Sequence, residues 1–319
     1  QLNDGGGMGT SATSLYHLFI EQAMKMKPRY LSMIIPSRWF AGGKGLDDFR
    51  DKMLKDRRIS KIVDYFDSTE CFPGVDISGG VCYFLWEKDR AGECNVESIR
   101  GGQKSAMTRP LLEKNSDSFI RFNEAISIAR KIGAKEEPCI DQIISPRKPY
   151  GFSSLVTIKE KPFSNSVYIY AYPHNGYINK NEIKQNQNWV AKNKVFIAKA
   201  YGERGSFPYL VLGKPFLGKP GSCCSETYLV VGPFDSKKNA NNTITYISTR
   251  LFRFLVLLKK NTQNAPRGVY SFVPVQDFSE AWTDEKLYKK YGLTKDEIAF
   301  IESMVRPMEV KNEEREVSR

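Results

Sequence analysis

The chain has 319 residues, of which 41% are hydrophobic and 26% are charged, a composition that is ordinary for a soluble globular protein and allows two domains. No stretch of eighteen apolar residues is present, which argues against a membrane span. Six cysteines without a CxxC spacing are expected to be free thiols in a cytoplasmic protein, and with only two histidines no metal site is expected.

The net charge of +12 is concentrated in one part of the sequence. Residues 101–280 hold 26 Lys and Arg against 13 Asp and Glu, whereas residues 1–100 hold 14 of each and residues 281–319 hold 8 against 9. A basic segment beside a neutral one indicates a polyanionic partner, usually nucleic acid. Charge alone leaves open the alternative of a basic surface that is merely solvated.

The first hundred residues alternate the apolar periods of helices and strands. In chain order they predict a helix over 14–27, a strand over 30–35, a helix over 46–53 and strands over 61–66 and 80–86, with a long loop over 67–79. Strands that alternate with helices predict an α/β fold whose parallel sheet is covered on both faces. The last two strands are close enough in sequence to form an antiparallel pair.

The rest of the chain changes character. Residues 87–104 are charged and contain glycine, as a linker would, and residues 118–131 predict a helix. Residues 140–235 predict an irregular, mostly β domain with short strands over 167–171, 195–198, 209–212 and 228–231. A helix over 243–260, a strand over 269–275 and a helix opened by the capping box Thr294–Glu297 follow.

Four motifs in the first part of the chain resemble one family. They are Leu15-Tyr-His-Leu-Phe-Ile20, Ile34-Ile-Pro-Ser-Arg-Trp39, Cys71-Phe-Pro-Gly-Val75 and Gly79-Gly-Val-Cys-Tyr-Phe-Leu-Trp86. Their order is similar to the second half of the catalytic domain of Eco57I-like adenine-specific DNA methyltransferases, which belong to bacterial and archaeal restriction–modification systems. Residues 278–308 resemble the ending of the same enzymes.

The resemblance implies a partial class I (Rossmann-like) methyltransferase sheet, followed by a mixed, mostly β target-recognition domain with C-terminal helices. We assign residues 1–104 to the catalytic domain, 105–280 to DNA target recognition and 281–319 to a C-terminal helical extension and tail. The Asn-Pro-Pro-Tyr catalytic motif and the Gly-rich loop that holds S-adenosylmethionine in the family do not occur in the sequence. We therefore expect a fragment with an incomplete cofactor site that is inactive alone.

Phe72 is the strongest candidate for a functional side chain. The family places a Phe-Pro pair in the loop between its last two strands, and that Phe stacks on the adenine flipped out of the duplex. Phe72 lies in such a loop beside Pro73 and Gly74, where a core residue is unusual. The resemblance also implies that Tyr16, Arg38 and Trp39 face the active-site crevice, with core packing as the alternative for Tyr16 and Trp39.

Base and phosphate contacts are expected from the basic domain, on loops that carry cations, amides and aromatic rings. For Arg253, on a predicted helix, a solvated helix face is the alternative. The candidates are Arg147, Lys148, Tyr150, Trp189, Lys199, Arg204, Lys214, Lys219 and Arg253.

These observations lead to two hypotheses about function. In the first, the parent protein transfers a methyl group from S-adenosylmethionine to adenine N6, and this chain binds duplex DNA without catalysing the reaction. In the second, the chain is a DNA-binding specificity module that docks on a separate catalytic or nuclease subunit. The partners expected are therefore duplex DNA and either the remaining half of the enzyme or a nuclease subunit, with no membrane.

Overall fold

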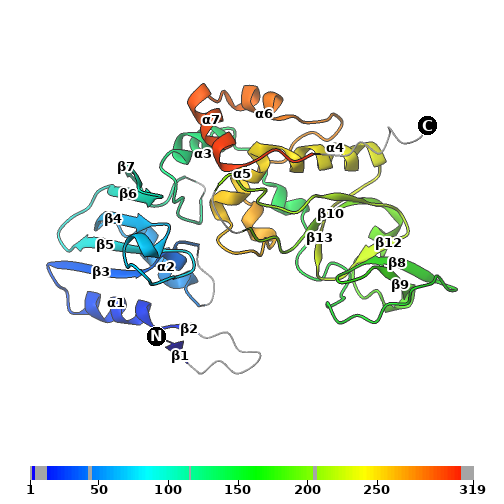
Figure 1. The fold of residues 1–319 in the computed structure, drawn as a ribbon, viewed down its shortest axis with the longest axis horizontal. Coiled ribbons are helices and arrows are strands. Elements are labelled where there is room, and N and C mark those ends of the chain that lie inside the picture. Colours follow the sequence, from blue (N-terminus) through cyan, green and yellow to red (C-terminus); the bar gives the residue numbers. More distant parts are fainter. Residues whose placement is uncertain (1, 4–12, 42–44, 115, 204–206, 310–319) are drawn as a thin grey trace. The chain divides into compact units, whose positions relative to one another are not determined.

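The computed structural model describes residues 2–3, 13–41, 45–114, 116–203 and 207–309. The chain forms two compact units, Gln1–Arg130 and Lys131–Arg319 (Figure 1). The predicted boundary after residue 104 differs from this division, because residues 94–109 form two strands of the first sheet rather than a linker. These strands carry many polar side chains, of which Glu97, Ser98 and Arg109 are buried, and this composition makes the segment resemble a linker in sequence.

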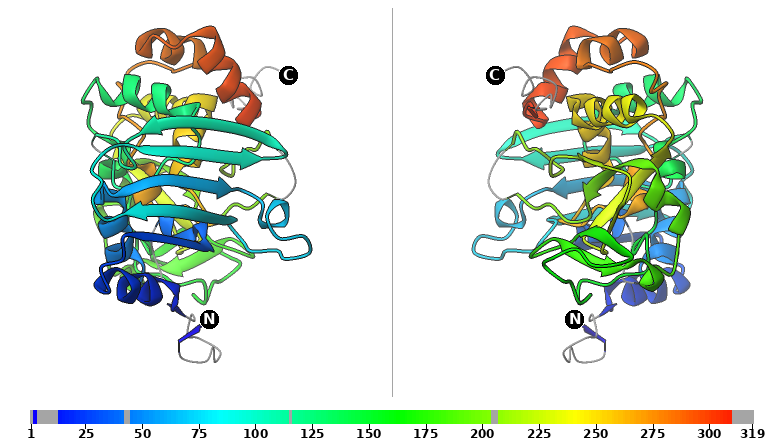
Figure 2. Two further views of the ribbon diagram at one scale, coloured as in Figure 1. Left: turned by 90° about the vertical axis from the view of Figure 1, so that its left-hand side faces the viewer. Right: turned by 90° about the vertical axis from the view of Figure 1, so that its right-hand side faces the viewer.

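Unit 1 is built on a five-stranded mixed sheet, seen face-on in the left view of Figure 2. In spatial order the strands are β3 (Tyr30–Pro36), β5 (Val81–Glu87), β4 (Ile59–Tyr65), β6 (Cys94–Arg100) and β7 (Gln103–Arg109). β5 is antiparallel to both β3 and β4, β6 is parallel to β4, and β7 is antiparallel to β6. The predicted antiparallel pairing of β4 and β5 is confirmed, whereas the prediction of a parallel sheet is wrong.

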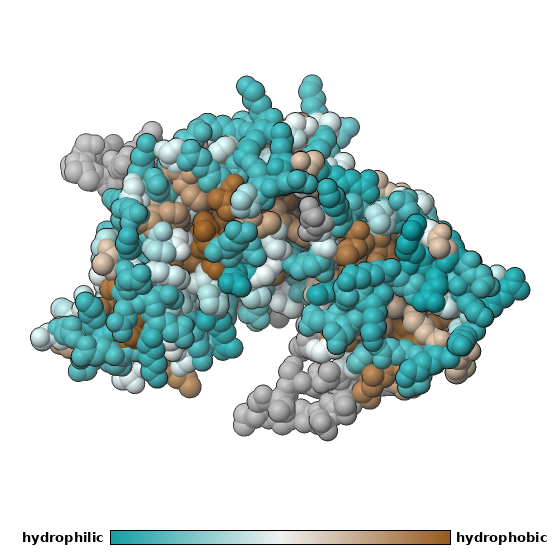
Figure 3. Space-filling model, turned by 180° about the vertical axis from the view of Figure 1, so that it is seen from behind, coloured by the Kyte–Doolittle hydropathy of each residue, from teal (hydrophilic) through white to brown (hydrophobic). Residues whose placement is uncertain are grey.

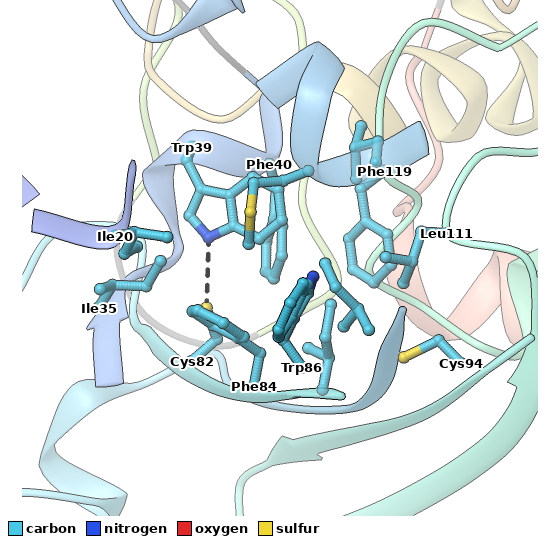
Figure 4. Close-up of a cluster of buried hydrophobic side chains, with 14 of the residues drawn as sticks. Ile20, Ile35, Trp39, Phe40, Cys82, Phe84, Trp86, Cys94, Leu111 and Phe119 are labelled. Carbon is cyan, nitrogen blue, oxygen red and sulfur yellow. Dashed lines mark hydrogen bonds between the residues drawn. The ribbon is translucent and has the colours of Figure 1, made fainter. Parts of the chain in front are cut away.

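The described part of unit 1 also contains six short elements, of which two helices and the turn after β3 share a hydrophobic core with one face of this sheet. They are β1 (Leu2–Asn3), β2 (Thr13–Ser14), α1 (Tyr16–Lys25), η1 (Ser37–Ala41), α2 (Asp47–Lys55) and η2 (Ser68–Glu70). Leu31 and Ile35 of β3 and Phe84 of β5 point into the same core as Phe49 of α2. Figure 4 shows part of this core, in which the Trp39 Nε1–H donates to Cys82 Sγ at 3.4 Å.

Both faces of the sheet are covered, as predicted, at the inner strand β4, where the consecutive residues Ile62, Val63 and Asp64 are all buried, but not at the edge strand β3. On β3, Tyr30 is 56% exposed and Ile34 is 44% exposed, while their neighbours Leu31 and Ile35 are buried. This alternation is that of a strand with one face in the core and one face at the surface. Brown apolar patches interrupt the mostly hydrophilic surface seen in Figure 3.

Unit 2 begins with small β-sheets, as predicted for residues 140–235. One sheet has the order β11-β10-β13 and the other the order β12-β8-β9. The strands are β8 (Ser166–Tyr170), β9 (Gly176–Asn179), β10 (Asn193–Ala198), β11 (Phe216–Gly218), β12 (Ser222–Cys224) and β13 (Tyr228–Phe234), with short turns η3 (Ile140–Ile143), η4 (Lys180–Glu182) and η5 (Gln187–Ala191). The predicted strands over 209–212 and 269–275 do not form; each contributes only an isolated bridge, at Tyr209 and Pro274.

Helices dominate the end of unit 2. They are α4 (Lys237–Ser248), α5 (Arg250–Lys259), η6 (Arg267–Tyr270), α6 (Asp284–Tyr291) and α7 (Lys295–Met304). A further helix, α3 (Ala125–Gly133), crosses the division between the two units. The single helix predicted over 243–260 is broken at Thr249, whose backbone is extended and whose Oγ1 accepts the Phe252 N–H as an N-cap. The predicted capping box of Thr294 and Glu297 at the start of α7 is confirmed.

Candidate functional site at one edge of the sheet

Three strands of unit 1 end at the same side of the sheet. β3 and β4 both run antiparallel to β5, and β6 runs parallel to β4, so their carboxyl ends share one edge. The segments that leave this edge begin at Ser37, Phe66 and Gly101. Loops beyond the carboxyl ends of strands are the usual ligand-binding region of open α/β sheets. We call this side the carboxyl edge.

The loop between β4 and β5 presents Phe72 on a tight turn. The Val75 N–H donates to the Phe72 carbonyl at 3.0 Å, with Pro73 and Gly74 at the central positions. Gly74 has φ 82°, so the turn has type II geometry, which requires a residue that tolerates positive φ. The Phe72 side chain is 39% exposed at this position, as the sequence predicted for a residue outside the core.

Buried Ser68 fixes the base of this loop. Its Oγ donates to the Val75 carbonyl at 2.7 Å and accepts the Ile77 N–H at 2.7 Å, while its own carbonyl accepts the Phe72 N–H at 2.7 Å. Glu70 Oε1 accepts the Gly102 N–H at 2.8 Å and so ties the loop to the turn between β6 and β7. The backbone beneath the Phe72 ring is therefore held from two directions.

A buried ion pair lies at the carboxyl edge, between Asp64, which precedes this loop in sequence, and Arg121, which follows it. Asp64, at 0% exposure in β4, accepts two hydrogen bonds from Arg121, from Nε at 2.6 Å and from Nη2 at 2.8 Å. Ser37, the first residue after β3, donates its Oγ–H to Asp64 Oδ1 at 2.7 Å. The Arg121 guanidinium also lies over the Phe66 ring at 4.0 Å. The group connects the ends of β3 and β4 to the segment before α3.

The three side chains expected in the crevice have different environments. Trp39 is fully buried in the core, so its assignment to the crevice is wrong: the indole packs at 4.6 Å from Phe40 and 5.7 Å from Phe49. Arg38 is half-buried in the turn after β3. Tyr16 is half-buried, and desolvation raises the pKa of its phenol well above the ordinary value.

Tyr16 lines an apolar cavity beside the edge strand β3. The cavity has a volume of about 400 Å³, and its other walls are Phe19, Met33, Ile34, Ile35 and Pro36. The Tyr16 hydroxyl is buried and has no hydrogen-bond partner among the described residues. We call this space the edge cavity.

A second cavity, of about 340 Å³, lies at the carboxyl edge under the β6–β7 hairpin. Ser98 and Arg100 of β6 and Gln103 and Ser105 of β7 contribute one side, since Ser98 pairs with Ser105 and Arg100 with Gln103. Its other walls include Phe66, Lys104, Phe122 and Glu124. We call this space the hairpin pocket. Sequence analysis missed it because half of its lining residues, Ser98, Arg100, Gln103 and Lys104, come from the segment that was predicted to be a linker.

Sequence reasoning also missed the Asp64–Arg121 pair. The one local signal was a carboxylate inside the apolar run Ile62-Val63-Asp64-Tyr65, because a charged residue in a buried strand needs a partner. Nothing in the sequence pattern identifies the partner, which lies 57 residues away.

The candidate DNA-contact side chains of unit 2 differ in their exposure to solvent. Lys214 and Lys219 are exposed, while Lys148, Trp189 and Lys199 are half-buried. Arg147 is exposed and donates its Nε–H to Glu226 Oε2 at 2.7 Å. Arg147 and then the Ser154 N–H lower the pKa of Glu226 from 4.5 to about 2. Arg204 lies outside the described residues.

Two candidates of unit 2 are core residues and the predictions for them are wrong. Tyr150 is fully buried, with its ring edge-on to Trp189 at 6.3 Å. Arg253 is also fully buried, and its guanidinium donates to the carbonyls of Ser248, Thr249, Leu210 and Arg306. Burial lowers the pKa of Arg253 to about 10. Neither side chain is available to a ligand at the surface.

Within the described ranges, no group of three or more His, Cys, Asp or Glu side chains could hold a metal ion. No helix in that part of the chain has the length and apolarity needed to cross a membrane.

Comparison with known proteins gives a family model and a curated relative that are each similar to part of the chain. A family model described as Eco57I restriction-modification methylase matches residues 2–72, a range that ends at Phe72. An uncharacterized adenine-specific methylase of Mycoplasma pneumoniae is 38% identical over 100 residues, which cover 31% of this chain and 24% of the relative. The match thus spans about a quarter of the length of that relative.

Two solved structures align with most of the chain at low identity. The type IIG restriction endonuclease BpuSI is 12% identical with a TM-score of 0.34, over 90% of this chain and 45% of the endonuclease. The type IIL restriction-modification enzyme MmeI, solved in complex with DNA, is 7% identical with a TM-score of 0.44, over 81% of this chain and 40% of MmeI. At these TM-scores the similarities do not establish a shared fold.

Proposed function

We propose that this chain, whose residues 2–72 are similar to the Eco57I methylase family, joins the closing part of an adenine methylase catalytic domain to a domain that recognises duplex DNA. The complete enzyme transfers a methyl group from S-adenosylmethionine to the N6 amine of a flipped adenine. The observation that carries the proposal is the coincidence of the family match over 2–72 with the turn that presents Phe72.

The strand arrangement of unit 1 supports the catalytic-domain part of this proposal. β5 follows β4 in sequence but lies between β3 and β4, antiparallel to both. An antiparallel last strand is what a class I methyltransferase sheet requires, so β3, β4 and β5 are proposed to be its last three strands. In this assignment the carboxyl edge is the active-site side of the sheet.

Phe72 has the role of an aromatic platform for the target adenine in this proposal. A base taken out of the duplex loses its stacking partners, and a new aromatic contact offsets that cost by about 1–3 kcal/mol. An exposed ring on a turn held by Ser68 and Glu70 meets this requirement, because little side-chain or loop freedom is lost when the base arrives.

Cofactor binding requires groups that these residues do not supply. S-adenosylmethionine carries an amino acid, a sulfonium and an adenosine, and the family holds the amino-acid part in a Gly-rich loop that the 319-residue sequence lacks. The edge cavity beside β3 is apolar, with Tyr16 as its polar side chain. Because this set does not fit the cofactor, and Asn-Pro-Pro-Tyr is absent, we assign no catalytic residue to this chain and propose that it is inactive alone.

DNA recognition is proposed for unit 2 and the segment before it. Residues 101–280 carry the whole excess of positive charge, and Lys214 and Lys219 place two exposed cations there. Phosphate contacts of this kind give salt-dependent affinity, whereas sequence discrimination needs side chains that reach base edges.

The test is selection of a random duplex DNA pool by the full chain at two salt concentrations, followed by sequencing of the retained fraction. We expect a short enriched motif that contains adenine. Salt-sensitive retention without enrichment contradicts the recognition role, because a basic surface alone binds in that way. A parallel methyl-transfer assay on the enriched duplex should give no product, and turnover by this chain would overturn the statement that it is inactive alone.

A second candidate function is a specificity module that docks on a separate catalytic or nuclease subunit. The observation that favours it is the edge strand β3, with Tyr30 and Ile34 exposed and the edge cavity beside it. An unpaired strand edge is a template for another strand. If the first function is correct, joining the missing catalytic residues to this chain in one polypeptide restores methyl transfer. If the second is correct, methyl transfer requires a separate catalytic subunit.

A further inference from the structure

Arg147 of unit 2 is paired with a buried carboxylate that occupies only part of its guanidinium. We propose that Arg147 reads a guanine of the recognition site through its two terminal NH₂ groups, and that Glu226 positions it for this contact. The inference rests on the proposed function and deepens it, since it names one base of the target and the side chain that selects it.

The geometry of the pair leaves two donor groups of Arg147 at the surface. Arg147 Nε donates to Glu226 Oε2 at 2.7 Å, and within the described ranges this is the one side-chain hydrogen bond that Arg147 makes. The Arg147 side chain is 63% exposed, whereas the Glu226 side chain is 8% exposed. Nη1 and Nη2 are therefore available to a ligand that offers two acceptors.

The carboxylate is held in place before any ligand arrives. Glu226 Oε1 accepts the Ser154 N–H at 3.0 Å, and the Glu226 N–H donates to the Phe152 carbonyl at 3.1 Å. Arg147 is the main reason that the pKa of Glu226 falls to about 2, so both members of the pair are charged at neutral pH. A guanidinium that is fixed in this way loses little side-chain freedom when it binds.

The backbone on either side of the arginine is also fixed. The Ser145 N–H donates to the Val230 carbonyl at 2.8 Å, and Ser145 Oγ accepts the Val230 N–H at 2.9 Å. On the other side, Asn186 Nδ2 donates to the Pro149 carbonyl at 2.7 Å. Lys148, between these anchors, has φ 59°, a strained conformation that is concentrated at functional loops.

The charge of the pair favours a base over a phosphate. Because the Glu226 carboxylate offsets the guanidinium, the pair has no net charge, whereas phosphate contacts draw their affinity from net positive charge and counterion release. Guanine presents O6 and N7 as two adjacent neutral acceptors in the major groove, and a bidentate arginine contact with them is the commonest specific contact to DNA. Two donors in a neutral pair suit that edge.

Two neighbours of Glu226 also fit a contact with bases. Leu155 follows Ser154, whose N–H the carboxylate accepts, and is 90% exposed. An apolar side chain beside a base-reading arginine can pack on the methyl group of thymine, whereas a hydrated phosphate offers no apolar partner. Lys199, half-buried, is a second cation that lowers the pKa of Glu226, and it supplies the net positive charge that the pair lacks.

The experiment uses the full chain and the duplex enriched in the selection described above. Each guanine is replaced in turn by 7-deazaguanine, which lacks the N7 acceptor and still pairs with cytosine. One position should weaken wild-type binding about tenfold. The same replacement should have no further effect on Arg147→Gln/Glu226→Gln, a double variant that removes the guanidinium at constant net charge.

A matched control makes the same change in another pair of unit 2. Arg306 is 47% exposed and is paired with the largely buried Glu203, so Arg306→Gln/Glu203→Gln should keep the full sensitivity to 7-deazaguanine. Neutral methylphosphonates, introduced one at a time, test for a phosphate contact at the same side chain. Urea unfolding checks that each variant folds, and Arg147→Gln alone, a change to an exposed side chain, repeats the test if Glu226→Gln unfolds the chain.

The positioning role of Glu226 has its own measurement. In Glu226→Gln, Arg147 keeps its charge and loses its anchor, so the effect of 7-deazaguanine should fall from about tenfold to about threefold. The slope of log K against log salt should become steeper by about 1, because the charge of Arg147 is no longer offset. A merely structural role predicts weaker binding with the discrimination and the slope unchanged.

The outcomes separate the two levels of the argument. If the wild-type chain enriches no sequence, the proposed function fails. If the enriched motif contains no guanine, or if 7-deazaguanine acts equally on the wild type and on Arg147→Gln/Glu226→Gln, the guanine assignment alone is wrong. A methylphosphonate position to which that variant alone is insensitive would show instead that Arg147 contacts a phosphate.

Discussion

Asp64 and Arg121 form two hydrogen bonds, of 2.8 and 2.6 Å, across 57 residues of sequence. The carboxylate is completely buried, while the guanidinium extends from it over the Phe66 ring towards the surface. Because Ser37 donates to the same carboxylate, one ion pair fixes the exits of two strands that never pair with each other.

Replacing Arg121 should destabilise unit 1 strongly. Arg121→Met leaves the Asp64 carboxylate buried with only Ser37 as a side-chain partner, and loss of one member of a buried pair costs about 3–5 kcal/mol. The double variant Asp64→Asn/Arg121→Met should lose less than the single one. Urea unfolding measures both, with Arg130→Met as the surface control at below about 1 kcal/mol. Equal losses for Arg121→Met and Arg130→Met would show that the pair is not important for stability.

Removing the Phe72 ring should affect binding and leave folding intact. Because the side chain is 39% exposed, Phe72→Ala should change the free energy of unfolding by less than about 0.5 kcal/mol. Affinity for a duplex with a mismatched target adenine should fall by about 1–3 kcal/mol as stacking is lost. Val75→Ala, in the same loop and 46% exposed, is the control. Fluorescence anisotropy gives both affinities, and equal values for the two variants would exclude stacking.

The Arg147–Glu226 pair should make the stability of unit 2 depend on acid pH. The pKa of Glu226 is about 2 in the folded chain and 4.5 ordinarily, so the folded state favours the charged carboxylate. Its contribution is fully present above pH 4.5 and is lost as pH falls towards 2. In urea at pH 7, Glu226→Gln should unfold at a lower midpoint than wild type, and the gap should narrow at pH 3. A gap that is constant with pH contradicts this linkage.

Arg253 and Lys214 should behave oppositely when each is replaced. Arg253→Met removes a side-chain donor from four carbonyls, two of them in buried hydrogen bonds, and a buried acceptor left unsatisfied costs about 1–3 kcal/mol, so unit 2 should unfold more easily. Lys214→Ala removes an exposed cation and should leave stability unchanged while it lowers DNA affinity and the salt slope. Unfolding and binding titrations of both variants suffice. A stable Arg253→Met variant with weakened DNA binding would instead support the DNA contact that the sequence predicted for Arg253.

Hydrogen exchange should be faster in residues 13–100 than in 140–275. β3 has an open edge and an exposed face, whereas β10 of unit 2 is paired on both sides by β11 and β13. Mass spectrometry after deuterium labelling compares the two regions, and light scattering establishes whether the sample is monomeric. Equal protection of both regions in a monomer would contradict the prediction.

Local sequence patterns identified the helix–strand order of residues 14–87 because each element there carries its own apolar period. The same reasoning failed for β6 and β7, whose polar and charged side chains, such as Glu97 and Lys104, pair across the hairpin instead of indicating a loop. It also failed at Thr249, because an N-cap inside a continuous apolar period leaves the period unchanged while it breaks the helix.

The predictions for the candidate site succeeded or failed for a similar reason. The position of Phe72 in an exposed loop followed from its Pro-Gly neighbours, which determine a turn within four residues. Burial of Trp39, Tyr150 and Arg253 depends on distant segments, and so does the pairing of Asp64. Aromatic and cationic side chains serve equally well in a core or at a surface, so residue type alone does not distinguish the two.

The insertion of β5 between β3 and β4 limits how early this part of the sheet can form while the protein is synthesised. Neither β3 nor β4 can pair with β5 until residues 81–87 have left the ribosome, and synthesis proceeds at about 5–20 residues per second. For a few seconds the edges of β3 and β4 that β5 later covers are therefore open in the nascent chain. The helix α2 between them carries Asp47, Asp48, Arg50, Asp51 and Lys52, and charged residues beside apolar strands oppose aggregation through such open edges.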